Sequence, residues 1–344
     1  MQSNCHQIAD NLSEIQKLKA DFDTLLVQGE KTQDTETSLG HLNQAESLQR
    51  ELEIRISSLR EQFHVSPEQA ERIMGPERFL GPQDLERAFG FQIKPQDIPP
   101  IPFKKEELEL HQRLGHMLVL NLSHAPDGTP LTIETMAKLA IAQIGSNVIE
   151  RDQQGNPAKY LLYKDQFDDQ GNLKTEAWFK NETQVIQQTP KAGWQFVSPN
   201  ILPDSTGKDY LKQTELLIQY AKQNVFAGSL PVEYQTAETE FKKRKPEIAK
   251  LIKQGDYIKA SQILSTLQVS RLLREPVQNT IFRYLVAHKK GQQLFTDGNY
   301  SWSSRTSSGG ALLRFGDANA TGARVRGNQP GNEWSGNGVV FSCS

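Results

Sequence analysis

Cysteine is almost absent from this chain of 344 residues, because its two cysteines, Cys5 and Cys343, stand at opposite ends. Two such distant residues do not make the disulfide framework of a small secreted domain. The seven histidines are scattered and share no metal-ligand spacing with these cysteines, which argues against a zinc site. We therefore expect no metal and no cofactor.

Long apolar runs and an excess of one charge are also missing. Mean hydropathy is −0.59, and no apolar run approaches the length needed to cross a bilayer. The first residues lack the basic start and apolar core of a secretory signal. The net charge of −2 and the isoelectric point near 6.4 give no electrostatic reason to bind nucleic acid or an anionic membrane. These absences predict a cytoplasmic protein with no membrane span and no nucleic-acid partner.

Motifs that mark catalysis are missing as well. The sequence has no glycine-rich phosphate loop, no His-Glu-x-x-His pair, no nucleophile elbow and no Cys-x-x-Cys motif. Carboxylates are plentiful, but no spacing marks an acid–base pair. His116, and His124 beside Ser123, are more typical of packing or surface residues than of catalytic ones. We predict no catalytic residues and no enzymatic activity.

Length and periodicity predict an α+β chain of two or three domains. We divide it into a helical hairpin or coiled coil at 1–65, a proline-rich connector at 66–103, a mixed α/β region with a small antiparallel sheet at 104–206, a helical region at 207–296, and a last segment at 297–344 that packs on the preceding region. The connector is defined by seven prolines, which cannot continue a helix interior.

The first segment carries two apolar stripes at three- and four-residue steps, separated by the polar interval 29–40. The stripes include Ile15, Phe22 and Leu25, then Ala45, Leu48 and Leu52. This pattern fits an amphipathic pair that packs on its own body. It fits equally a coiled coil that forms a homo-oligomer through residues 1–65.

Further helices are predicted along the chain. One begins near Lys104, and another is capped by Thr132 and ends at Gly145. The helical region contributes residues 210–222, 231–245, 246–254, 257–267 and 276–288, of which three begin at a proline. The basic cluster 242–245 could contact nucleic acid, but glutamates beside it favour a solvated face.

Between these helices the period changes to that of strands. The strand-like runs are residues 160–163, 177–179 and 193–197, separated by turns that contain glycine. Trp178 and Trp194 in these runs could stack on a sugar or a base. A small sheet that packs on helices explains them at least as well.

The last segment differs in composition from all that precedes it. After Lys290 every cation is an arginine, and Gly, Ser and Asn supply nearly half of residues 297–344. Three short apolar alternations have the period of two expected of half-buried strands; they centre on Arg314, Arg324 and Val340. Glycine and serine richness alone would favour a flexible tail. Disordered segments are poor in aromatics, however, so aromatic residues such as Trp302, Phe315, Trp334 and Phe341 favour an ordered β module.

This segment resembles the C-terminal variable domain of the target proteins of diversity-generating retroelements, of the type common in candidate-phylum bacteria. The residues that carry the resemblance are Trp302-Ser303-Ser304, Gly309-Gly310, Leu313-Arg314-Phe315-Gly316, Gly322-Ala323, Val325, Pro330 and Gly338-Val339-Val340-Phe341-Ser342. Two positions depart from the family: Cys343, where arginine is common, and Tyr300, where tryptophan is frequent. The region before the tail resembles the same family more diffusely.

The resemblance implies a C-type-lectin-like fold, similar to formylglycine-generating enzymes, whose surface loops are rewritten by adenine-directed mutagenesis to bind a protein or other macromolecular ligand. The implied ligand-binding residues are Ser304, Arg305, Thr306, Asp317, Ala318, Asn319, Ala320, Arg324, Arg326, Gly327, Asn328, Gln329, Asn332, Glu333, Trp334 and Ser335. Among them Arg324, Arg326 and Trp334 would be anchors, since arginine and tryptophan supply most binding energy in such surfaces. Leu313, Phe315, Val325, Val339 and Phe341 would form the scaffold. Replacing Asn319 or Asn332 should therefore change stability by only about 0.5 kcal/mol.

Other functions fit parts of the sequence. A formylglycine-generating or other enzyme could use the same fold, but such oxidases need paired cysteines and the tail offers Cys343 alone. A calcium-dependent lectin would need a Glu-Pro-Asn type motif, which is absent. A structural scaffold would place the function in the N-terminal helices.

Overall fold

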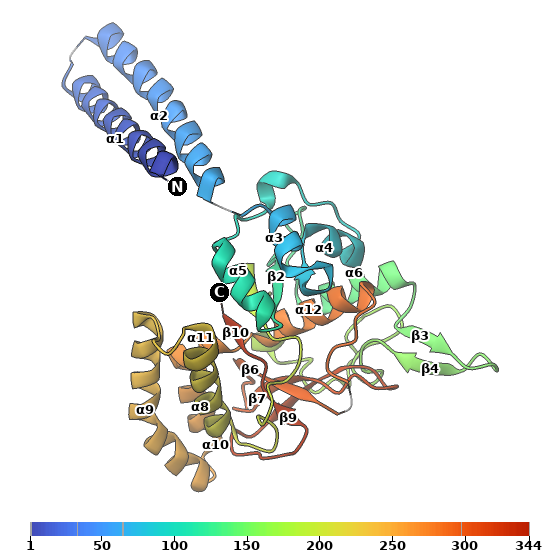
Figure 1. The fold of residues 1–344 in the computed structure, drawn as a ribbon. Helices are drawn as coiled ribbons and strands as arrows, with labels where there is room; N and C mark the ends of the chain where they lie inside the picture. The colour runs from blue at the N-terminus through green and yellow to red at the C-terminus, as the bar shows by residue number, and fades with distance from the viewer. Residues whose placement is uncertain (1, 33, 64, 297, 344) are drawn as a thin grey trace. The chain divides into compact units, whose positions relative to one another are not determined.

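The computed structural model describes residues 2–32, 34–63, 65–296 and 298–343 (Figure 1). The chain divides into two compact units, residues 1–66 with 100–104, and residues 67–99 with 105–344. The side chains of residues 2–12 and 56–63, among them Cys5, lie outside the described part. Within the described ranges, no helix is both long enough and apolar enough to cross a membrane.

The first unit is a pair of helices, α1 (Gln2–Lys31) and α2 (Thr35–Phe63). The break between them is shorter than the predicted interval 29–40, because Gly29 and Gly40 both lie inside helices. Gly29 is buried against His41 and Leu42, and its carbonyl oxygen accepts a hydrogen bond from Ser38 Oγ at 2.9 Å. A Cβ at Gly29 would lie 3.7 Å from His41 Cβ, an ordinary contact distance, so this glycine is part of the packing between the helices and does not end a helix.

The second unit contains a four-stranded sheet in the order β1-β2-β5-β10. Its strands are β1 (Phe79–Leu80), β2 (Met117–Asn121), β5 (Gly193–Val197) and β10 (Ser342–Cys343). β1 is parallel to β2, and the other pairs are antiparallel. The sheet thus joins the proline-rich segment, the middle region and the end of the chain.

A second four-stranded sheet, in the order β8-β7-β6-β9, is built from the tail alone. It comprises β6 (Tyr300–Thr306), β7 (Leu312–Gly316), β8 (Arg324–Asn328) and β9 (Asn337–Gly338). Helix α12 (Val277–Lys289) contacts strands of both sheets, as Figure 1 shows. Its residues 277–287 are all buried, as expected of a helix that is covered on every side.

Further elements surround these sheets. The helices are α3 (Pro67–Met74), α4 (Pro82–Phe89), α5 (Lys105–Arg113), α6 (Ile133–Ile144), α7 (Thr183–Ile186), α8 (Tyr210–Tyr220), α9 (Val232–Lys253), α10 (Tyr257–Thr266) and α11 (Gln268–Leu273). Short turns are the 3₁₀ helices η1 (Pro76–Arg78) and η2 (Pro95–Asp97) and the π-helix η3 (Ala221–Val225). A separate hairpin pairs β3 (Val148–Arg151) with β4 (Pro157–Tyr160).

Several local predictions are confirmed. The structure is mixed α and β. Thr132 caps α6 by accepting a hydrogen bond from the backbone N–H of Thr135, and Gly145 ends that helix with φ 96°. The run 193–197 is strand β5. These features depend on neighbouring residues, which is why the sequence reveals them.

Other predictions are wrong. Residues 177–179 form a turn, in which Ala177 and Phe179 are buried and Trp178 is half exposed, so that the burial alternates as in a strand. Of the run 160–163, only Tyr160 belongs to a strand. The predicted break at Pro246 does not occur, because α9 runs through it. Buried Phe241 and Ile248 lie on either side of that proline, and their packing offsets the lost backbone hydrogen bond.

The segment 66–103 is also more than a connector. It supplies β1 and α4, whose Leu80, Leu85 and Phe89 belong to the buried core. The predicted divisions after residue 103 do not mark separate bodies, because residues 105–344 belong to one compact unit. Some of its paired strands, such as β5 and β10, are well over a hundred residues apart in the sequence, and the sequence carries no local signal for such pairing.

A candidate ligand-binding surface on the tail

The five residues predicted as scaffold lie in the core. Leu313, Phe315, Val325, Val339 and Phe341 are each at most 1% exposed. Phe315 packs edge-on against Tyr284 of α12, with 5.2 Å between ring centroids. The tail is therefore anchored to the rest of its unit through its apolar side chains.

Strand β8 is the outer strand of the tail sheet, and side chains from the middle region cover its edge. Gln166 Nε2 donates to the carbonyl oxygen of Val325 at 2.7 Å, and the Val325 N–H donates to Gln166 Oε1 at 3.1 Å. Trp178 Nε1 donates to the same carbonyl at 3.1 Å. One buried amide thus replaces a neighbouring strand, so this part of the edge cannot pair with another chain.

The loop between β7 and β8 is tied to residues 160–164. The N–H of Tyr160 donates to Ala320 O at 3.0 Å, and the N–H of Lys164 donates to Thr321 O at 3.1 Å. Gly322 has φ 91°, and a Cβ there would meet the carbonyl carbon of Leu162 at 2.3 Å. Only glycine fits this close approach, so the path of the loop is fixed. Within the loop Ala320 is exposed, whereas Ala318, Asn319 and Thr321 are half-buried.

Asp317 organises the polar side chains of this loop. Its Oδ2 lies 3.2 Å from Arg324 Nε and accepts a hydrogen bond from the Tyr300 hydroxyl at 3.1 Å. Its Oδ1 accepts from Asn319 Nδ2 at 2.9 Å. Asn319 Oδ1 in turn accepts from the backbone N–H and hydroxyl of Thr321, at 2.8 and 2.7 Å. Burial, aided by the negative charge of Asp317, raises the pKa of the Tyr300 phenol.

The loop between β8 and β9 is held in a similar way. Asn332 Oδ1 accepts from the Trp334 N–H at 3.1 Å and from Asn337 Nδ2 at 2.8 Å. Glu333 forms a 2.5 Å ion pair with Lys212 of α8. Asn319 and Asn332 are thus turn-forming residues. Their replacement should cost more than the 0.5 kcal/mol predicted from the sequence, because several hydrogen bonds are lost.

The predicted surface residues differ in exposure. The exposed ones are Arg305, Ala320, Gln329, Glu333, Trp334 and Ser335, and the half-buried ones are Thr306, Asp317, Ala318, Asn319, Arg324, Arg326, Gly327, Asn328 and Asn332. Ser304 is 8% exposed and donates its N–H to the carbonyl oxygen of Glu275 at 3.0 Å. Its prediction as a surface residue is wrong, because β6 turns this position toward α12 and its neighbours.

The surface residues also divide between two ends of the sheet. Tyr300 pairs with Gly316 at one end, beside Asp317 and the 317–323 loop. Thr306 pairs with Leu312, which pairs with Asn328, so Arg305 and Thr306 lie at the other end. Arg326 lies between these ends opposite Arg314. The sheet therefore presents a strip rather than one compact pocket.

Three residues that contribute to this strip were not predicted as ligand-binding residues: Arg314, Tyr300 and Tyr163. Arg314 stacks over the Tyr300 ring at 4.2 Å and over the Trp334 ring at 5.0 Å. The guanidinium carbon of Arg324 lies 4.1 Å from the centroid of the Tyr163 ring. Arg314 could have been found, because it lies between the inward-facing Leu313 and Phe315. Tyr163 could not, because it is far away in sequence.

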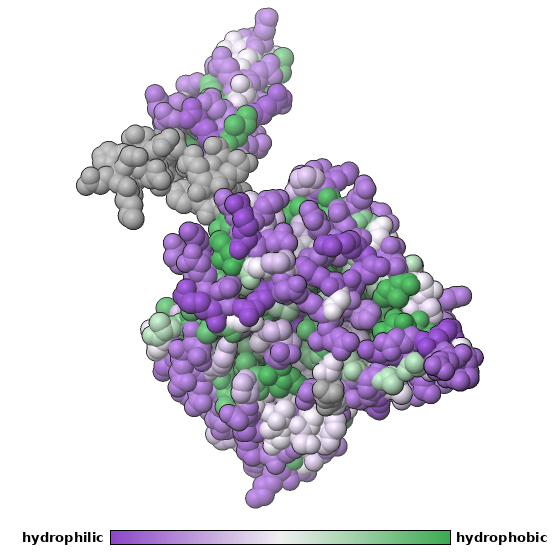
Figure 2. Space-filling model, turned by 45° about the vertical axis from the view of Figure 1, so that its right-hand side comes forward, coloured by the Kyte–Doolittle hydropathy of each residue, from purple (hydrophilic) through white to green (hydrophobic). Residues whose placement is uncertain are grey.

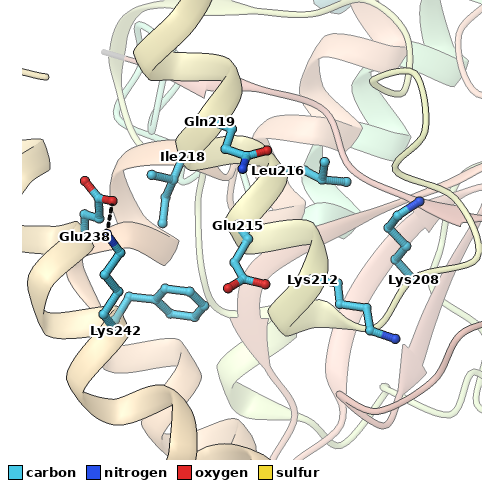
Figure 3. A pocket seen from close by; sticks show the side chains of 9 residues that line it. Lys208, Lys212, Glu215, Leu216, Ile218, Gln219, Glu238 and Lys242 are labelled. Atoms are coloured by element: carbon cyan, nitrogen blue, oxygen red, sulfur yellow. Dashed lines mark ion pairs between the residues drawn. The ribbon is translucent and has the colours of Figure 1, made fainter. Parts of the chain in front are cut away.

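A separate cavity of about 440 Å³ lies between α8 and α9 (Figure 3). Buried Phe241 lines it together with charged side chains. Lys242 pairs with Glu238 at 2.5 Å, and Lys245 with Glu215 at 2.5 Å. Lys242 and Lys245 of the basic cluster 242–245 are thus paired within the chain. Lys212 connects this cavity to the loop that carries Glu333.

Neither the face drawn in Figure 2 nor the thiol of Cys343 adds a second candidate site among the described residues. On the coloured part of the face in Figure 2, hydrophobic residues form small patches separated by hydrophilic ones. Cys343 is buried, and burial raises the pKa of its thiol, so the unreactive protonated form is favoured. In the described ranges, no three His, Cys, Asp or Glu side chains are grouped to hold a metal ion. A scan of protein-family models, a search of curated proteins and a search of solved structures each found no match to this chain.

Proposed function

We propose that this chain is a non-enzymatic ligand-binding protein with a C-type-lectin-like tail, whose surface residues are diversified by a retroelement. One observation carries the proposal. Leu313, Phe315 and Val325 of the tail strands are at most 1% exposed, whereas the polar residues between them are half-buried or exposed. A scaffold of this kind keeps its backbone while the outward side chains change, as antibody loops do.

The arrangement of the loops supports the same proposal. Backbone hydrogen bonds to Tyr160 and Lys164 hold the 317–323 loop. Because these bonds use main-chain atoms, they persist when side chains such as Ala318 or Ala320 are exchanged. Partial burial of Arg324 and Arg326 and the 44% exposure of Trp334 are suitable for anchors of a ligand.

A genomic test addresses this function directly. The gene should lie near a reverse transcriptase and near a non-coding copy of the tail that differs from it only at adenines. Sequences of the tail from many cells should vary at codons of the outward-facing residues and be constant at Leu313, Phe315 and Val325. A tail that is identical in all cells, with no second copy, would contradict the proposal.

The helix pair supports multivalent display as part of this function. Val27, Leu39, Leu42 and Ile54 are exposed on it, at 46% or more. A second copy of the chain would cover such residues in a larger helical bundle. Several tails on one bundle would multiply weak contacts through avidity.

A further inference from the structure

Three arginines and three aromatic residues form one connected group on the tail strip, which we call the arginine cluster: Arg314, Arg324, Arg326, Tyr163, Tyr300 and Trp334. Arg314 lies over Tyr300 and Trp334, whose ring centroids are 5.6 Å apart. Arg324 and Arg326 lie over Tyr163, at 4.1 and 5.8 Å. Stacking on aromatic faces holds the guanidinium groups in defined planes.

Positive charge in the cluster is only partly balanced. Arg324 pairs with Asp317, and both side chains are largely buried, at 13% and 17% exposure. Arg314 and Arg326 are direct cross-strand partners. Neither of them forms an ion pair with a carboxylate of the described residues. Like charges opposite each other on neighbouring strands destabilise a sheet. An anion bound beside them would remove that cost.

The guanidinium of Arg314 also lacks some of the partners that would stabilise its positive charge. Its Nε is buried and has no hydrogen-bond partner in the described part of the chain, while its terminal nitrogen contacts Asn337 Oδ1. Burial lowers the pKa of the Arg314 guanidinium to about 10, and the charge of Arg326 acts in the same direction. Arg326 is half exposed, so it is the member that can turn its fork of N–H groups toward a ligand.

We propose, building on the function proposed above, that the arginine cluster binds a carboxylate side chain of an acidic peptide segment. Arg326 binds the carboxylate through two parallel N–H···O hydrogen bonds, and the positive charge of Arg314 on the neighbouring strand adds to the attraction. Tyr163 and Trp334 contact the apolar part of the same segment. This form of the tail therefore prefers proteins that expose Asp or Glu beside an apolar residue.

The surroundings favour a single carboxylate over a polyanion. A cavity of about 500 Å³ adjoins Tyr160 and Lys164 and is lined by Asp165, Asp168 and Asp169. These acids would repel the next phosphates of a nucleic acid that lay across the cluster. Nucleic-acid binding also needs many phosphate contacts, which a chain of net charge −2 does not offer here.

Selection from a random peptide library tests this inference. The immobilised full-length chain is used to enrich peptides, and the most enriched one is synthesised and titrated against wild type and variants. We expect Asp and Glu to be enriched next to an apolar residue. Arg326→Gln should weaken binding at least about tenfold, since a hydrogen bond between charged groups is lost. Raising sodium chloride from about 0.05 to about 0.5 M should also weaken it.

Controls separate this inference from the proposed function. Lys243→Gln removes the same unit charge from an exposed position on α9, and it should bind as wild type does. Enriched peptides without acidic residues, or equal binding by Arg326→Gln, would overturn the carboxylate specificity and leave the proposed function standing. An oligonucleotide that binds more tightly than the acidic peptide would also overturn it. If no peptide is enriched at all, the carboxylate specificity is overturned as well, whereas the proposed function is refuted only by the genomic comparison described above.

Discussion

Trp178 Nε1 donates a hydrogen bond to the carbonyl oxygen of Val325 at 3.1 Å, which ties a turn of the middle region to the outer strand of the tail. Gln166 bonds to both backbone groups of the same valine. The tail sheet is therefore not a self-sufficient module. Its exposed strip depends on side chains that precede it by well over a hundred residues.

We predict that Gln166→Leu destabilises the protein by about 2 kcal/mol. The substitution leaves the buried N–H of Val325 without a partner, and an unsatisfied buried group costs about 1–3 kcal/mol. Gln170→Leu, at an exposed position of the next turn, is the matched control. Denaturant unfolding of both variants would check this, and equal stabilities would show that Gln166 does not close the edge of β8.

Stability should fall as the pH drops below about 6.5. His111 and His116 are buried, with 2.7 Å between their Nδ1 atoms. Burial lowers the pKa of His111 to about 3, with help from the charge of His116, and lowers that of His116 to about 4. The unfolded chain, with a histidine pKa near 6.5, binds more protons, so each histidine costs about 1.4 kcal/mol per pH unit between 6.5 and its folded pKa.

Comparing unfolding free energies at about pH 7.5 and 5.5 isolates this effect. His111→Phe, which keeps the stack on Phe196 at 3.6 Å, should reduce the difference between the two pH values. His124→Asn, at an exposed position, should not change it. An unaltered pH dependence in His111→Phe would mean that this buried pair does not remain neutral in the folded protein.

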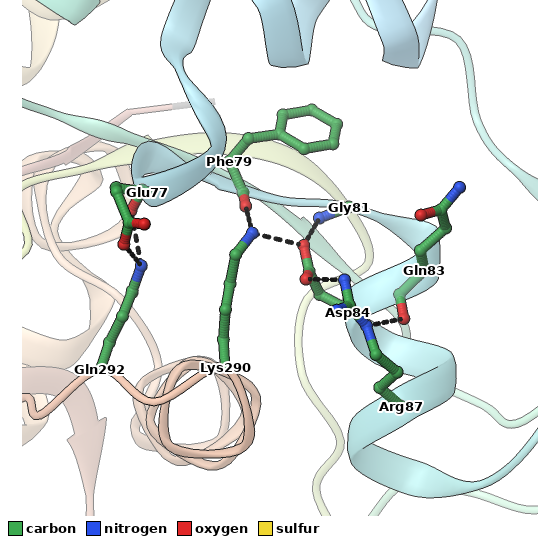
Figure 4. Close-up of polar contacts among 8 residues, drawn as sticks. All are labelled: Glu77, Phe79, Gly81, Gln83, Asp84, Arg87, Lys290 and Gln292. Carbon is green, nitrogen blue, oxygen red and sulfur yellow. Dashed lines mark hydrogen bonds and ion pairs between the residues drawn. The ribbon is translucent and has the colours of Figure 1, made fainter.

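Asp84 and Lys290 form a largely buried ion pair at 3.0 Å that joins α4 to the end of α12 (Figure 4). Asp84 also accepts from the N–H of Gly81 and from Arg87. Asp84→Ala leaves the Lys290 ammonium without its carboxylate partner. The free energy of unfolding should fall by about 3 kcal/mol, because breaking a buried pair leaves a charge uncompensated. Glu247→Ala, which removes an exposed ion pair, should cost less than about 1 kcal/mol. Similar losses in thermal unfolding would contradict the assigned role of Asp84.

Oligomers should depend on the exposed apolar residues of the helix pair. The double substitution Leu39→Glu and Leu42→Glu places two charges where a second copy would pack, so the mass in solution should fall toward that of one chain. Asn43→Glu and Gln44→Glu add the same charges at exposed polar positions of α2 and should leave the mass unchanged. Light scattering on the full-length variants provides the reading. A wild-type chain that is already monomeric would refute self-association.

Local signals explain what the sequence could reveal. The alternation around Arg314 predicted the strand β7, and the cap at Thr132 predicted the start of α6, because each depends on residues within a few positions. The buried and outward sides of the tail strands follow from the same period of two. Ser304 was misplaced because β6 is buried on both faces from Tyr300 to Ser304, so a serine there does not face solvent.

The features that the sequence could not reveal depend on contacts between residues that are far apart in the chain. Nothing near Tyr163 indicates that its ring receives Arg324, and nothing near Gln166 indicates that it bonds to Val325. Asn319 and Asn332 looked freely exchangeable in the sequence, yet each holds a turn through hydrogen bonds. Pro246 was expected to divide a helix that packing keeps continuous.

The central claim is that a fixed set of buried side chains carries a surface that tolerates change. A complete substitution scan of residues 298–343, read out as protease resistance of the folded chain, measures this most directly. We predict that Ala318, Ala320, Gln329 and Ser335 accept nearly every residue, within about 0.5 kcal/mol. Phe315→Ala should cost about 3–5 kcal/mol. If substitutions at the outward positions unfold the protein as readily as those at Leu313, Phe315 and Val325, the division into scaffold and variable surface is wrong.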